Sequence, residues 1–98
     1  MPVFIVSLSY TSPIEEIERF LPEHVVFLDR HYAAGRFLLS GRKVPRTGGV
    51  ILALADSRTA LERLLAEDPF QREGLARYEL TEMVPTRSAP ALGFLLEA

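Results

Sequence analysis

Two short segments of the sequence are apolar at nearly every position: VFIVSLSY at residues 3–10 and VILALA at residues 50–55. A strand that is apolar on both faces fits the middle of a sheet, where neither face meets water over its whole length. The pattern therefore predicts two central strands. A chain of 98 residues can bury one core of modest size. We predict a single domain over residues 1–98, with a core at 3–84 and a C-terminal tail at 85–98.

Two further segments have weaker strand patterns. Residues 37–41, FLLSG, follow Gly35 closely, and a polar connection at 42–49 separates them from the second apolar run. Residues 76–84 alternate between apolar and polar side chains, as expected of a half-exposed edge strand. The sheet is therefore predicted to have these two segments at its edges.

The first helix has a clear start. Ser12 can serve as the N-cap, Pro13 suits the first helical position, and Glu15 could complete a capping box with Ser12. Pro22 falls inside the helical pattern of residues 14–34, where a proline removes one hydrogen bond and clashes with the preceding turn. The pattern allows one unbroken helix over residues 14–34 or a bend near Pro22, and we expect a short helix before Pro22 and a second helix after it.

The segment 21–35 carries both histidines. Its apolar side chains recur at the spacing of one helical stripe and are Leu21, Val25, Leu28 and Tyr32. This stripe is predicted to face the core, with His24 beside it. His31 follows seven residues later, roughly 10 Å along a helix axis at about 1.5 Å per residue. The two rings then share a helix face but cannot easily bind one metal ion.

A second helix is predicted after the second apolar strand, with Asp56 or Ser57 as its N-cap. Its inner stripe is formed by leucines, at positions 61, 64 and 65. Pro69 disfavours the helical conformation at the preceding residue, so Asp68 is expected to lie in a turn. Gly74 permits a further turn before the last strand.

The resulting order βαββαβ predicts an α+β fold, a two-layer sandwich of the ferredoxin-like type with a four-stranded antiparallel sheet. Two helices of this length can cover only one face of such a sheet. We therefore expect a homodimer through the open sheet face. The apolar run at 91–96 is expected to pack against the body of the chain or against a partner subunit.

The composition excludes several classes of partner. The formal net charge of −2 gives no basic surface for nucleic acid, and no apolar run approaches the ~20 residues that span a bilayer. The chain has no cysteine, hence no disulfide framework and no thiolate metal site. The N-terminus enters a strand pattern without the features of a signal peptide, so a cytoplasmic location is expected.

His24 is the first candidate for chemistry, because histidine alone has an ordinary pKa near neutrality. One interpretation is a general acid or base one turn into a helix. The alternative is a histidine that borders the core and is inert. A metal site built from His24, His31 and carboxylates is a third possibility, although no compact ligand motif supports it. No metal and no cofactor is expected.

Several segments together resemble the YciI-like family, which belongs to the dimeric α/β-barrel relatives of the ferredoxin-like fold. The resemblance covers roughly residues 3–84 and is carried by His24 with FLD, AAGRFLLSG, VPRTGG with VILA, AEDPF and RYEL. It implies a dyad of His24 and Asp68, with Ser40 and Gly41 near the same pocket. Two departures are Leu21, where many members have arginine, and Arg42, where many have proline.

The family resemblance implies lyase-like chemistry on muconate-like metabolites. A carboxylate on one imidazole nitrogen leaves the other nitrogen free to move a proton, and Ser40 lies in no nucleophile motif. We therefore expect a small acid–base enzyme, a lyase or isomerase, acting on a small carboxylate-bearing substrate. The side chains expected to bind its carboxylates are Arg36, Arg42 and Arg46. The alternative is a non-catalytic dimeric module that binds a small acidic metabolite or a protein.

Overall fold

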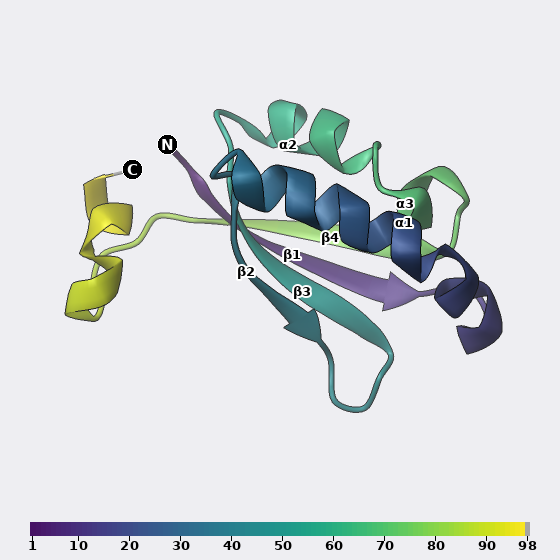
Figure 1. Ribbon diagram of the computed structural model, residues 1–98. Coiled ribbons are helices and arrows are strands. Elements are labelled where there is room, and N and C mark those ends of the chain that lie inside the picture. Colours follow the sequence, from purple (N-terminus) through teal and green to yellow (C-terminus); the bar gives the residue numbers. More distant parts are fainter. Residues whose placement is uncertain (98) are drawn as a thin grey trace.

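The computed structural model describes residues 1–97 and has the α+β ferredoxin-like architecture (Figure 1). Its elements are β1 (Val3–Tyr10), α1 (Ile14–Ala33), β2 (Phe37–Arg42), β3 (Gly48–Leu54), α2 (Arg58–Leu65), α3 (Pro69–Arg72), β4 (Ala76–Met83) and the 3₁₀ helix η1 (Pro90–Glu97). Among the residues described, no helix has the length and apolar character needed to cross a membrane.

The sheet has the order β2-β3-β1-β4, and every neighbouring pair is antiparallel. The two apolar strands are therefore central, as predicted from their composition. The register places Ile5 of β1 opposite Leu52 of β3 and Thr81 of β4. Because side chains alternate along a strand, Phe4, which is fully buried, points to the other face.

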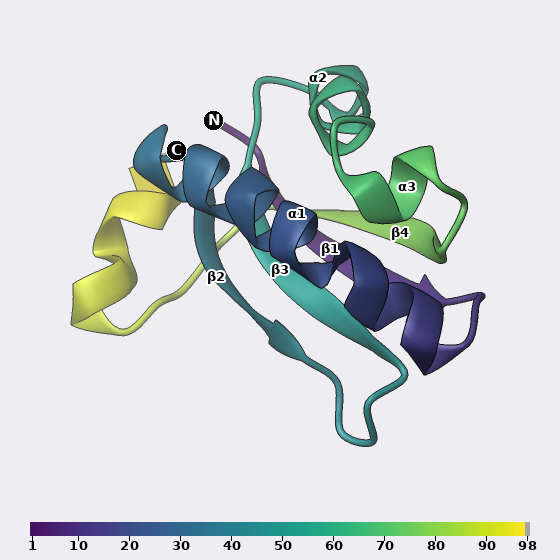
Figure 2. The ribbon, with the colours of Figure 1, turned by 45° about the vertical axis from the view of Figure 1, so that its right-hand side comes forward.

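All three α-helices lie on one face of the sheet (Figure 2). The core forms between them and that face. Its largest buried side chains come from both layers and are Phe4, Val6, Ile17, Phe27, Leu61, Leu65 and Phe70. Ser57 caps α2 by accepting a hydrogen bond from the Ala60 N–H at 3.1 Å, which selects Ser57 over Asp56 as the N-cap.

Helix α1 is continuous through Pro22, so the expectation of two separate helices is wrong. Pro22 and Glu18, whose carbonyl loses its helical donor, both lie on the exposed side, where water can replace the missing hydrogen bond. The predicted capping box is also absent, because Pro13 occupies the N-cap position and no side chain caps this end. Packing of one long face on the sheet holds the helix together despite the proline.

The buried stripe of α1 differs from the predicted one. Val25 is 45% exposed and Tyr32 is 37% exposed, whereas Phe27 and His31 are buried. The stripe is thus rotated toward the histidines. His24 and His31 point from α1 toward the segment that joins α2 to α3, where the carboxylates of Glu67 and Asp68 are hydrogen-bonded to them.

Strand β3 starts at Gly48, two residues earlier than predicted. Gly48 is buried against β1: a Cβ atom at this position would lie 1.8 Å from the carbonyl oxygen of Leu8. Only glycine fits so close to a neighbouring main chain. The residue therefore lets β1 and β3 pair to the end of the sheet that carries the cavity described below.

The sheet face opposite the helices carries apolar side chains that are only partly covered. Ile5 is 37% exposed, Val50 38%, and Leu39 67%. Val3 lies on the same face by strand alternation yet is fully buried, and Leu95 of η1 is only 5% exposed. Val3 and Leu95 are therefore both covered within the chain, whereas Ile5, Val50 and Leu39 stay partly open.

Candidate active site

The site is built around the short segment between α2 and α3. Asp68 is fully buried and is the N-cap of α3, accepting a hydrogen bond from the Phe70 N–H at 3.1 Å through Oδ1. Pro69 occupies the first turn of α3, where its missing N–H leaves no unpaired group. The turn predicted for Asp68 is therefore a helix start, and it holds the carboxylate in a fixed position.

His24 reaches this carboxylate from α1. Its Nδ1 lies 2.8 Å from Oδ1 of Asp68, although 44 residues separate the two in sequence. The predicted proximity of the two side chains is confirmed. A carboxylate accepts hydrogen bonds, so Nδ1 carries the proton in this contact and Nε2 is the nitrogen without it in the neutral ring.

Tyr78 of β4 provides the third donor to Asp68, through a short hydrogen bond from its hydroxyl to Oδ2. Burial raises the pKa of Tyr78, and the charge of Asp68 raises it further. The hydroxyl therefore stays protonated and continues to donate. The sequence pattern predicts Tyr78 on an edge strand but does not predict this contact with Asp68. The signal that could have indicated it is the place of Tyr78 on the inward side of the alternating strand.

Replacement of Tyr78 by phenylalanine should lower the free energy of unfolding by about 1–2 kcal/mol at neutral pH, because Oδ2 of Asp68 loses its donor. A tyrosine with a raised folded-state pKa stabilises below its unfolded pKa of about 10 and loses that contribution as pH rises further. The stability of the natural protein should thus fall more steeply above pH 10 than that of Tyr78→Phe in urea denaturation. Parallel curves between pH 7 and 11 would contradict this assignment.

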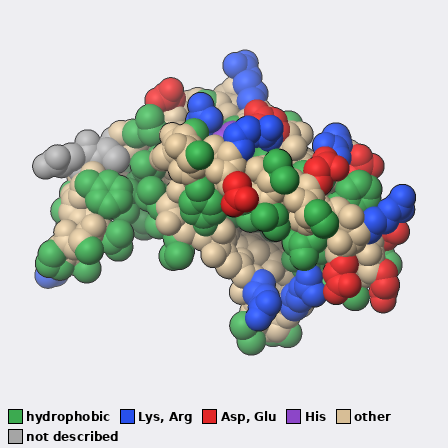
Figure 3. All heavy atoms as spheres, in the orientation of Figure 1, with side chains coloured by type: hydrophobic (Ala, Val, Ile, Leu, Met, Phe, Trp, Pro, Cys, Tyr) green, Lys and Arg blue, Asp and Glu red, His purple; other side chains and the backbone are tan. Residues whose placement is uncertain are grey.

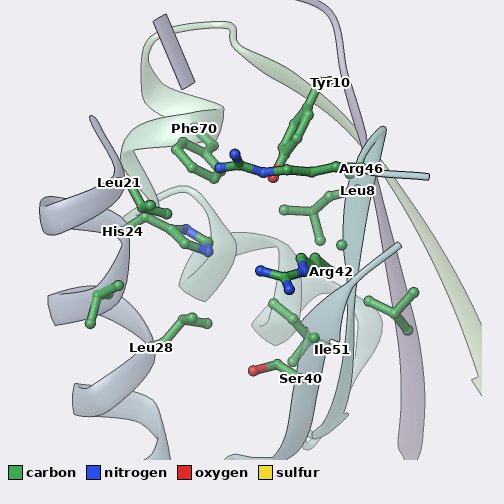
Figure 4. Close-up of a pocket in the computed structure, with 15 residues that line it drawn as sticks. Leu8, Tyr10, Leu21, His24, Leu28, Ser40, Arg42, Arg46, Ile51 and Phe70 are labelled. Atoms are coloured by element: carbon green, nitrogen blue, oxygen red, sulfur yellow. The ribbon is translucent and has the colours of Figure 1, made fainter. Parts of the chain in front are cut away.

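The imidazole of His24 is held flat against Phe70. The two ring centroids are 4.1 Å apart and the planes differ by 9°. Since the Phe70 N–H also binds Asp68, α3 fixes both the ring and its carboxylate partner. The side chain of His24 retains 12% exposure on the cavity side shown in Figure 4.

A cavity of about 320 Å³ lies between α1, the sheet and the start of α3. Its apolar walls include Leu8, Leu21, Leu28, Ile51 and Phe70, and His24 and Tyr10 also line it (Figure 4). The polar groups on the β2–β3 side are Ser40, Gly41, Arg42 and Arg46. The structure therefore brings together His24 and four of the five residues predicted to bind substrate.

The two cavity arginines differ in their pairing. Arg46 is 3.2 Å from the carboxylate of Glu18, whereas Arg42 makes no ion pair with any side chain in the described part of the chain. Lys and Arg side chains gather over the β2–β3 hairpin in Figure 3. Ser40 is hydrogen-bonded to the Tyr32 hydroxyl at 2.5 Å. The cavity thus joins apolar walls to a cationic rim.

Arg36 does not reach this cavity, and the structure corrects that prediction. The residue follows Gly35, whose φ of 75° turns the chain out of α1, and it lines a second cavity of about 350 Å³ with His31 and Glu67. The turn therefore places Arg36 past the C-terminal end of α1, away from His24.

The two histidines bind different carboxylates, His24 that of Asp68 and His31 that of Glu67. Within residues 1–97 no three His, Asp or Glu side chains converge as ligands of one metal ion. The shared metal site considered from the sequence is therefore not formed by these residues.

The chain is similar to a known domain family and to several solved structures. The sequence profile of the YCII-related domain matches residues 3–84. None of the curated protein sequences matches the chain. Similar solved structures include 5-chloro-2-hydroxyhydroquinone dehydrochlorinase (TftG) from Burkholderia phenoliruptrix AC1100 in complex with 2,5-dihydroxybenzoquinone, with a TM-score of 0.71, 16% identity and coverage of 81% of this chain and 90% of that chain.

A second similar structure is SnoaB, a cofactor-independent oxygenase from Streptomyces nogalater. Its TM-score is 0.52 at 17% identity, and the match covers 91% of this chain and 96% of that chain. At these identities the two structures establish a shared fold only.

Proposed function

Since the chain belongs to the family of YCII-related domains, we propose that it is a small acid–base enzyme, a lyase or isomerase, that uses His24 and Asp68. The observation that supports this most directly is the hydrogen bond of 2.8 Å from His24 Nδ1 to a fully buried carboxylate. It leaves Nε2 as the basic nitrogen beside the cavity.

In this proposal Nε2 of neutral His24 takes a proton from a carbon or oxygen atom of the substrate. The imidazolium that forms is stabilised by the charge of Asp68. Three hydrogen-bond donors hold the carboxylate of Asp68 in a fixed position. Return of the proton to another atom completes an isomerisation, and departure of a leaving group completes an elimination. Ser40 is hydrogen-bonded to Tyr32 rather than to a base, which disfavours a covalent route.

The cavity fits a small unsaturated molecule that carries acidic oxygens. Its apolar walls favour a flat ring or diene, and Arg42 and Arg46 favour carboxylate or enolate oxygens at the rim. Muconate-like dicarboxylates have this chemistry. TftG, a dehydrochlorinase with a bound dihydroxybenzoquinone, offers an analogy for an acidic ring compound in the same fold.

Binding of two probes tests the cavity. We expect cis,cis-muconate or 2,5-dihydroxybenzoquinone to raise the melting temperature and to perturb the His24 ring signals in NMR spectra. Replacing Arg42 and Arg46 together by glutamine should weaken binding by at least about tenfold, because each charged hydrogen bond contributes about 1.5–3 kcal/mol. Arg36→Gln is the matched control and should change the affinity less than about twofold.

The outcome also separates the alternative function. Binding of a probe without turnover, unchanged by His24→Gln, would favour a non-catalytic module for a small acidic metabolite. Absence of binding by both probes, in a folded protein, would contradict the proposed substrate class. Binding with proton exchange at a probe carbon, lost in His24→Gln, is the result expected of the enzyme.

We also propose that the protein is a homodimer through the open sheet face. Leu39 is 67% exposed there, beside the partly covered Ile5 and Val50, and such an apolar face is typical of an interface. Light scattering at micromolar concentration should give twice the chain mass, and Leu39→Glu should give the monomer. The control is Val26→Glu, a change at a residue 62% exposed on α1, which should leave the dimer intact; a monomeric natural protein would contradict the proposal.

A further inference from the structure

Side-chain pairs join α1, over two helical turns, to the segment between α2 and α3 and to α3 itself. The pairs lie in order along α1 and are Glu23–Arg72 at 2.5 Å, His24–Asp68 at 2.8 Å, Arg30–Glu67 at 3.1 Å and His31–Glu67 at 3.1 Å. The two histidines thus bind carboxylates that are adjacent in sequence. Glu67 is the residue on which two of these pairs converge.

His31 is a rigid point of attachment. Its side chain is 3% exposed, and its ring packs against those of Phe27 and Phe37, with centroid distances of 4.9 and 5.2 Å. Arg36 approaches Nδ1 at 3.4 Å. A guanidinium can only donate, so Nδ1 accepts and the ring proton lies on Nε2, directed at Glu67. Packing and proton placement therefore both fix the direction of the His31–Glu67 bond.

We propose that His31 and Glu67 are positioning residues for the dyad. Glu67 is held from one side by His31 and Arg30, and the next residue in the chain carries the carboxylate that binds His24. Anchoring the main chain at residue 67 limits the movement of Asp68 relative to α1. The inference rests on the proposed function only in treating the dyad as catalytic; the alignment itself is a property of the folded chain.

The tautomer of His24 reports this alignment. In the aligned state Asp68 holds the proton on Nδ1, whereas an unrestrained neutral imidazole favours the proton on Nε2. ¹⁵N NMR at about pH 9, above the ordinary range of histidine titration, should show mainly the Nδ1–H form in the natural protein. Glu67→Ala should lower the ratio of the Nδ1–H form to the Nε2–H form of His24 by about tenfold. Glu67→Gln keeps an acceptor for His31 and should stay within about twofold of the natural ratio.

Glu67 is 49% exposed at its side chain, so its variants are expected to fold. Glu62→Ala is the matched control, because Glu62 is exposed on α2 and its nearest basic partner, Arg58, is 4.0 Å away; it should leave the ratio unchanged. An unchanged ratio in Glu67→Ala would overturn the proposal even if the melting temperature fell, since a purely structural role affects stability without the tautomer. No turnover is measured, so failure of the enzyme proposal would leave this result intact.

Discussion

Asp68→Asn should lower kcat by about 10²-fold while His24 keeps its proton on Nδ1. The Phe70 N–H and His24 Nδ1 both donate to Oδ1 of Asp68, so an asparagine is oriented with its oxygen at this position. Its NH₂ group then faces the Tyr78 hydroxyl, which can turn from donor to acceptor. The negative charge is what the variant loses. A charged hydrogen bond contributes about 1.5–3 kcal/mol, or roughly ten- to 150-fold in rate.

This expectation differs from the simplest dyad argument, in which an asparagine reverses the imidazole tautomer. The Phe70 N–H, absent from any sequence argument, decides the orientation. His24→Ala should cost about 10²–10⁴-fold in kcat, because the base itself is removed. Asp29→Asn, at an exposed position on α1, is the charge-matched control and should retain full activity. Full activity in Asp68→Asn would show that the buried charge takes no part in the reaction.

Gly48→Ala should destabilise the protein by about 3 kcal/mol or more. The new methyl group would lie 1.8 Å from the carbonyl oxygen of Leu8, and main-chain atoms cannot move aside as a side chain can. Overpacking usually costs about 1–3 kcal/mol, and this contact lies at the upper end because β1 and β3 must separate. Urea denaturation with circular dichroism measures the change.

The matched control is Gly41→Ala, on the neighbouring strand. A Cβ atom there would meet no atom within 4 Å, so its stability should change by less than about 1 kcal/mol. A Gly48→Ala variant as stable as Gly41→Ala would mean that β1 and β3 are farther apart at this end than the structure shows. Gly48 also lines the cavity, so the separation of the strands should weaken probe binding as well.

The architecture was predictable because its signals are carried by segments of several residues. The apolar runs at 3–10 and 50–55 marked the central strands, and alternation at 76–84 marked an edge. Single-residue signals were less dependable. Pro22 did not end the helix, since its missing hydrogen bond falls on the exposed side, and packing of the whole inner face outweighs one lost bond.

The candidate site was predictable where residues with suitable chemistry lie in segments whose place in the fold the sequence pattern also indicates. His24 and Asp68 are close as predicted, and Arg42 and Arg46 line the cavity. The left-handed turn at Gly35 directs Arg36 to the other cavity. The charge of Arg36 indicates that it could bind an anion, but it does not indicate toward which cavity the turn directs the side chain.

The two members of the dyad should have different histories of substitution in related chains. Asp68 caps α3 and binds Tyr78 as well as His24, so a chain that has lost its chemistry still needs an acceptor at this position in order to fold. Nε2 of His24 serves no such need. Retention of the aspartate in a relative is therefore weak evidence of activity, whereas replacement of the histidine beside an intact Asp–Tyr pair would identify a relative that keeps the fold without the base of the proposed reaction.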